Sequence, residues 1–228
     1  MEFLVAMSVF TVVLAVAGTA VAVSFDAANT SRQTQNLNEE ARQALNRMAR
    51  DMRQATSIVT AVNADGAGFD ATKIVAVRFQ ADFDGDGCFA GVGPGSCLAY
   101  SPANPEDITY CFDPSTSQLY VIDNNAPGVT PIDPSAPSCT GGQPLLAGNV
   151  GGLKLEYRSN EYRYDTTPSD GVTTWHELDA AGPPVGDSNG ILDVELADVD
   201  SVVFDLEMFA GGHQQDYRTQ VDLRNRSR

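Results

Sequence analysis

The sequence predicts an α+β fold in which one long N-terminal helix packs on a C-terminal antiparallel β-sheet domain. Three observations predict it. Residues 3–25 contain no charged side chain, residues 26–60 carry an apolar stripe at helical spacing, and residues 61–228 alternate between β-type runs and turn-rich stretches. We therefore expect a transmembrane helix over 1–25, its amphipathic continuation over 26–60, and an extracytoplasmic β-rich globular domain over 61–228.

The first segment is long enough to cross a bilayer. Residues 3–25 form a helix of about 33 Å, and the hydrocarbon core of a membrane is about 30 Å thick. A cleavable signal peptide is the weaker interpretation, because the run is long and no basic residue precedes it. A simple anchor explains the apolar run but not Glu2, since a carboxylate at the edge of hydrocarbon is costly unless it is paired or reaches water.

The second segment continues the helix with one apolar face. Its apolar residues recur at steps of three and four from Leu37 to Met52 and on to Ile58, which is the pattern of an amphipathic helix. Acidic and basic residues occupy the opposite face. No proline interrupts the first 93 residues, so we expect a single helix of about 55–60 residues.

The remainder reads as strands and loops. The predicted strands are rich in β-branched and aromatic residues, and Gly- or Pro-rich loops separate them at 82–97 and 124–144. The strands are expected at 73–81, 107–113, 118–123, 152–159, 175–178, 201–210 and 216–225, with hairpins joining 107–113 to 118–123 and 201–210 to 216–225.

Charge and cysteine content restrict the class of protein. The net charge is −16, with 30 acidic and 14 basic residues, which argues against a nucleic-acid partner because phosphate binding needs a basic face. Four cysteines lie at 88, 97, 111 and 139, without the spacing of a structural zinc site. We expect two disulfides, and Cys88–Cys97 with Cys111–Cys139 is our first choice of three connectivities. Four reduced, buried thiols are the alternative.

Two acidic loops are candidate calcium sites. Asp82, Asp84 and Asp86 supply oxygens at alternate positions before Gly87, but the twelfth position is Gly93, which excludes a true EF-hand. A second cluster holds Asp187, Asn189 and Asp193. Each is either a partial calcium site completed by oxygens from elsewhere or an ordinary acidic turn. Calcium is the one cofactor that the sequence suggests.

The sequence offers no recognisable active site. It contains no GxSxG, HExxH or phosphate-binding loop, and the two histidines, His176 and His213, belong to no repeated motif. We therefore expect a protein without enzymatic activity.

The helical segments resemble those of a known family. EFLVAMSVFTVVLAVA resembles the N-termini of type IV pilins and pseudopilins, which typically read F-T-L-[IMV]-E-[LF]-L-V-A-[ML], so that Glu2 falls on the glutamate of the N-methylation motif. NEEARQALNRMARDMRQA is similar to the matching helix of larger minor subunits, the W-type of pili and the J-type of type II secretion. YRTQVDLRNR is similar to the last strand of W-type minor pilins. The resemblance covers about 60 residues strongly and the last 25 weakly.

This resemblance implies a pilin-like fold and a role as a minor pilin or pseudopilin. It implies a single-pass protein of the inner membrane with its globular domain outside, which then enters a type IV pilus-like filament or its priming or tip complex. The implied partners are other pilin or pseudopilin subunits, the inner-membrane assembly platform and the prepilin peptidase. In the family, the glutamate pairs with the N-terminal amine of a neighbouring subunit, and this role is carried to Glu2.

One departure from the family pattern concerns the N-terminus. The family carries a basic leader ending in glycine and about four residues before the glutamate, whereas Met1 alone precedes Glu2 here. We interpret Met1 as an internal residue of a longer precursor. The competing class is a membrane-anchored extracytoplasmic binding or adhesion protein that does not polymerise, for which Glu2 would be dispensable.

Overall fold

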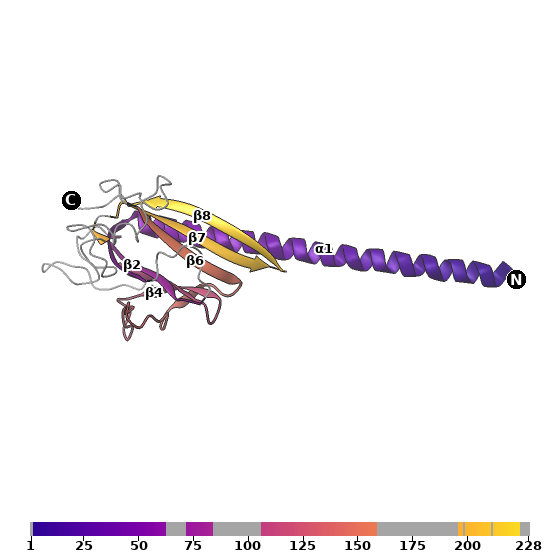
Figure 1. The fold of residues 1–228 in the computed structure, drawn as a ribbon, viewed down its shortest axis with the longest axis horizontal. Coiled ribbons are helices and arrows are strands. Elements are labelled where there is room, and N and C mark those ends of the chain that lie inside the picture. The colour runs from indigo at the N-terminus through magenta and orange to yellow at the C-terminus, as the bar shows by residue number, and fades with distance from the viewer. Residues whose placement is uncertain are drawn as a thin grey trace.

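A computed structural model describes residues 2–62, 72–83, 106–158, 196–197, 199–210 and 212–223. Its longest element is α1, Glu2–Arg53, a helix of 52 residues. At 1.5 Å per residue this helix is about 78 Å long. Figure 1 shows its C-terminal half lying against the β domain and its N-terminal half projecting from one end of that domain. The α+β layout and the long N-terminal helix predicted from the sequence are confirmed.

The strands form two antiparallel sheets. The first has the order β1-β2-β3-β4-β5, with strands Ala55–Val62, Val75–Ala81, Asp107–Asp113, Gln118–Asp123 and Gln143–Leu146. The second has the order β6-β7-β8, with strands Val150–Arg158, Ser201–Ala210 and His213–Asp222. Among the described strands, neighbours in each sheet also follow one another along the chain, so each sheet is ordered as a meander.

The apolar stripe of α1 joins the two sheets into one core. It contacts β2 and β5 of the first sheet and β7 and β8 of the second. The buried helical side chains are Leu37, Ala41, Ala44, Leu45, Met48, Ala49 and Met52. They pack against large buried residues of both sheets, among them Phe79, Tyr110, Phe204 and Tyr157. The stripe read from the sequence up to Met52 is therefore the buried face of the helix.

The predicted end of the helix is wrong. We expected helix to about residue 60, but α1 ends at Arg53 and β1 begins at Ala55. The segment 55–62 is rich in β-branched residues, which favour strands. Two register shifts in β1, between Ala55 and Ser57 and between Ile58 and Thr60, bury Ala55, Ile58 and Ala61. These buried positions recur every three residues and so imitate a helical stripe.

Other predicted boundaries also move. Strands β3 and β4 match their predicted ranges, and β2 and β6 begin two residues from theirs. The predicted loop 124–144 ends earlier, because Gln143 and Pro144 belong to β5 at the edge of the first sheet, a position that tolerates proline. The final hairpin is tighter than predicted, since β8 starts at His213 rather than 216 and Ala210 pairs with His213. The predicted strand 175–178 lies outside the described residues.

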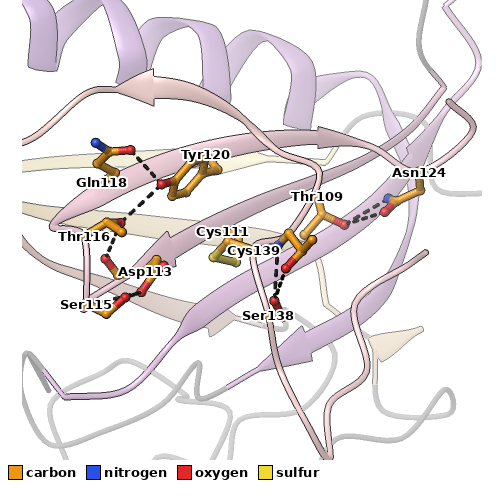
Figure 2. The surroundings of a disulfide bond; sticks show 11 residues. Thr109, Cys111, Asp113, Ser115, Thr116, Gln118, Tyr120, Asn124, Ser138 and Cys139 are labelled. Carbon is orange, nitrogen blue, oxygen red and sulfur yellow. Dashed lines mark hydrogen bonds between the residues drawn. A yellow bond between two sulfur atoms is a disulfide. The ribbon is translucent and has the colours of Figure 1, made fainter. Parts of the chain in front are cut away.

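A disulfide holds a loop over the outer face of the first sheet. Cys111 of β3 is bonded to Cys139, 28 residues later, and Figure 2 shows this bond between the strand and the returning loop. Both cysteines are buried in a second, smaller apolar cluster with Val62, Ala76, Ile122 and Ile132. The predicted Cys111–Cys139 pair is therefore confirmed, and Cys88 and Cys97 lie outside the described part of the chain.

Buried charged groups connect the elements at defined points. Asp51, near the end of α1, accepts a hydrogen bond of 2.8 Å from the Tyr110 hydroxyl on β3. Burial, together with the Asp51 charge, raises the pKa of Tyr110, which keeps this donor protonated. On the other face of the sheet, Asp107 accepts two hydrogen bonds from Arg78, of 2.8 and 2.6 Å. It also accepts one of 2.7 Å from Asn124 in the loop that follows β4.

Removing the disulfide is expected to destabilise the domain without unfolding α1. In the chain-entropy description, opening a crosslink across 28 residues costs about 3–4 kcal/mol. The double variant Cys111→Ala/Cys139→Ala, as full chain in detergent micelles, should lose that much free energy of unfolding in urea. A loss of less than about 1 kcal/mol would show that the loop is held by packing alone.

Removing the Tyr110 hydroxyl tests the connection between helix and sheet. Tyr110→Phe leaves Asp51 Oδ2 without its buried donor, so the free energy of unfolding should fall by about 1–3 kcal/mol. Tyr120→Phe is the matched control, because the Tyr120 hydroxyl is bonded to Gln118 in a partly exposed position, and it should change stability by less than about 0.5 kcal/mol. Equal effects of the two variants would contradict this assignment.

Candidate assembly helix

The N-terminal half of α1 presents an unburied apolar surface. Its described large side chains between Phe3 and Phe25 are 52–74% exposed, and they cover a broad arc of the helix surface. They are Phe3, Met7, Phe10, Val13, Leu14, Val16, Val21, Val23 and Phe25. Contiguous exposed apolar surface on this scale marks a membrane-contact or protein-contact segment. The β domain lies at the other end of the helix and does not cover this surface (Figure 1).

The polar side chains described within this half are satisfied by the helix itself. Thr11 donates to the carbonyl of Met7 at 3.1 Å, and Thr19 donates to that of Val16 at 2.9 Å. Ser24 donates to the carbonyl of Ala20 at 2.8 Å. Hydroxyls bonded back to their own helix cost less to move into an apolar environment, because they do not lose a water partner there. These internal hydrogen bonds therefore lower the cost of placing the segment in an apolar environment, whether lipid or other apolar helices.

The length and composition of α1 suffice for a membrane crossing. It is the one helix within the described residues that is long and apolar enough, and none of the apolar window is buried inside the domain. The structure is therefore consistent with single-pass membrane anchoring near the N-terminus.

A polar segment separates the exposed apolar half from the docked half. Residues 26–36, DAANTSRQTQN, are helical and exposed or half-exposed, and the buried stripe begins only at Leu37. Thr30 and Thr34 bond back to the carbonyls of Asp26 and Thr30. Eleven helical residues rise about 16 Å. The β domain is consequently held some distance along the helix axis from the apolar surface.

The β7–β8 hairpin fixes where docking begins. The Tyr217 hydroxyl on β8 hydrogen-bonds to Asn38 Oδ1 of α1, and it lies 2.6 Å from Gln215 Oε1. Burial raises the pKa of Tyr217, so the hydroxyl is a proton donor at neutral pH. Asn38 and Tyr217 are 179 residues apart, and the amphipathic pattern alone gave no signal for this contact.

The structure places some of the predicted site residues and does not describe others. Glu2 is the first residue of α1, where the backbone alone is described. Asp82 follows β2, whereas Asp84, Asp86, Asp187, Asn189 and Asp193 lie outside the described residues. Among the residues that are described, no three His, Cys, Asp or Glu side chains gather as a metal site would require. The calcium sites therefore stay predictions.

Comparisons leave the identification open. No protein-family model, no curated protein and no solved structure matches this chain. Its function must therefore be argued from the helix and the domain themselves.

A charge in the middle of the apolar half is expected to prevent membrane insertion. Arginine at the centre of a spanning helix costs about 2.5–3.5 kcal/mol relative to an apolar residue. Val16→Arg should therefore move the full chain out of the carbonate-resistant membrane fraction. Gln33→Arg, in the exposed polar segment, should stay in it. Carbonate-resistant membrane retention of Val16→Arg would argue that this segment does not span.

Proposed function

We propose that the chain is a minor pilin or pseudopilin, a non-catalytic structural subunit that assembles through α1 into a type IV pilus-like filament or its priming or tip complex. One observation carries the proposal: a single uninterrupted helix is apolar over residues 3–25, is exposed at every side chain described in that segment, and docks onto a β domain from Leu37 onward. In such a helix, one half is available to contact lipid or the same helix of another subunit, while the other half is packed against the β domain.

The low cost of moving the apolar half of α1 from lipid into a bundle of apolar helices supports assembly. A spanning helix leaves lipid at low cost when an equally apolar surface receives it, and association in such an environment depends on close packing rather than on the hydrophobic effect. The same half of a second subunit is such a surface. Because Thr11, Thr19 and Ser24 are bonded within the helix, transfer between lipid and helix bundle breaks none of these bonds.

The disulfide supports the proposed orientation. Bonds such as Cys111–Cys139 persist in oxidising compartments outside the cytoplasm. We infer that the β domain lies on the extracytoplasmic side of the inner membrane before assembly and that it then becomes part of a surface filament or periplasmic pseudopilus. The inner-membrane assembly platform and the prepilin peptidase, acting on the precursor, complete the proposed set of partners.

In this proposal Glu2 sets the axial register of the subunit. A carboxylate at the head of an apolar helix needs a cationic partner once it leaves water. The resemblance of EFLVAMSVFTVVLAVA to pilin N-termini indicates the N-terminal amine of the neighbouring subunit as that partner.

The test separates insertion from assembly. Glu2→Ala, introduced into the chromosomal gene, should leave the amount of protein in the membrane fraction unchanged. Breaking a buried charge pair costs about 3–5 kcal/mol, so incorporation into sheared filaments or pseudopili should fall by more than about a hundredfold.

Glu40→Ala is the matched control, because Glu40 is an exposed carboxylate on the docked half of the same helix. It should assemble normally. If Glu2→Ala filaments are as abundant as those of Glu40→Ala, or if the wild-type protein stays wholly in membranes, the non-polymerising anchored binding protein becomes the better description.

A further inference from the structure

A cleft opens between the docked half of α1 and one edge of the first sheet. Its volume is about 420 Å³, within the range of about 300–1,000 Å³ that small-ligand sites occupy. Arg47 lines it from the helix, Val121 and Asp123 line it from β4, and Gln143 and Pro144 line it from β5. The cleft is therefore bounded by segments from three separate parts of the chain.

The guanidinium of Arg47 has N–H donors that are available to a ligand. Its side chain is 44% exposed, and its ion pair with Asp51 is 3.7 Å long, beyond hydrogen-bonding distance. Asp51 already accepts hydrogen bonds from Tyr110 at 2.8 Å and from Arg50 at 3.2 Å. Within the part of the chain that the structure describes, the Arg47 guanidinium therefore makes no hydrogen bond.

The surroundings of Arg47 restrict the kind of ligand. Ile108, Val121 and Pro144 supply the apolar part of the lining, beside the polar side chains of Arg47, Asp123 and Gln143. A planar guanidinium next to an apolar surface matches a carboxylate bidentately and suits its attached hydrocarbon. Asp123 also lines the cleft, and its negative charge opposes every negative group of a ligand, so a ligand with one carboxylate is disfavoured less than a ligand with two. These features together select a monocarboxylate with a small apolar body.

The far wall of the cleft is fixed in place. It is formed by Val129 and Gly141 of the loop that the Cys111–Cys139 bond ties to β3. The next residue, Gly142, donates to the carbonyl of Cys139 at 3.2 Å. A Cβ at Gly142 would come within 2.8 Å of the Tyr120 Cβ, so the loop packs closely on β4. A wall held in this way does not have to be ordered when a ligand binds, which favours affinity.

We propose that this cleft is a binding site for a monocarboxylate carrying a small apolar group, with Arg47 as the residue that pairs with the carboxylate. The proposal goes beyond filament assembly and does not depend on it, because the cleft belongs to the docked half of α1 and to the β domain. Two sources supply this chemistry: a free carboxylic acid, or the C-terminal carboxylate of a peptide whose backbone runs along the edge strand β5.

Matched probes can test the site on the full chain in detergent micelles. N-acetyl-leucine carries the carboxylate and an apolar side chain, and N-acetyl-leucinamide is its neutral counterpart. In an NMR titration the acid should bind saturably, and the amide should bind roughly tenfold more weakly. Arg47→Gln should weaken binding of the acid by a similar factor and leave binding of the amide unchanged, since a charge-assisted bidentate pair would be lost.

The controls make the result specific to Arg47. Arg53→Gln removes an exposed arginine from the last turn of the same helix and should not change binding of the acid. Loss of the long, partly exposed Arg47–Asp51 ion pair should lower the urea midpoint of Arg47→Gln only slightly, which excludes unfolding as the cause. The proposal is overturned if the acid and the amide bind equally, if Arg47→Gln binds the acid as the wild type does, or if no saturable shift occurs.

A further pair of probes distinguishes the sources of the carboxylate. The peptide N-acetyl-Ala-Ala-Leu with a free C-terminus should bind more tightly than N-acetyl-leucine if β5 recognises a peptide backbone. Equal affinity would support a free carboxylic acid as the ligand of the same site.

Discussion

The packing of the helical stripe from Leu37 to Met52 holds this molecule together. No strand of one sheet pairs with a strand of the other among the described residues, and α1 touches strands of both. Small residues such as Ala41 and Ala44 let the helix approach closely, while Met48 and Met52 fill the space between the sheets. The core of the domain thus depends on a helix whose N-terminal half lies outside that domain. Any event that pulls on the apolar half acts directly on the core.

Polar contacts orient this packing rather than drive it. Apolar burial is non-directional, so a stripe alone leaves the helix free to slide or rotate over the sheets. Asp51 with Tyr110 at the end of the helix, and Asn38 with Tyr217 near the start of the docked half, fix both ends of the contact. The disulfide acts in a different place, on the outer face of the first sheet, where it holds a loop that has little regular structure of its own.

Local patterns in the sequence predict most of the fold, and long-range contacts explain what they miss. The apolar run, the stripe to Met52 and the hairpin of β3 and β4 follow from residue type and spacing, whereas the Cys111–Cys139 pair belongs to one of three possible connectivities that only the fold distinguishes. The end of α1 does not follow from spacing, because β1, with its two register shifts, buries Ala55, Ile58 and Ala61 at near-helical intervals. The cleft beside Arg47 is equally hidden, since it exists only where α1, β4 and β5 meet.

The polar segment over residues 26–36 has a mechanical consequence, because it is helical rather than a flexible tether. A flexible tether would let the β domain swivel, but a helix transmits torsion. Deleting one residue from it would turn the domain by about 100° about the helix axis and shorten its stand-off by about 1.5 Å. Deleting seven residues, close to two full turns, would bring the domain about 10 Å nearer while altering its heading by only about 20°. The number of residues in the segment 26–36 thus sets the orientation of the β domain about the helix axis.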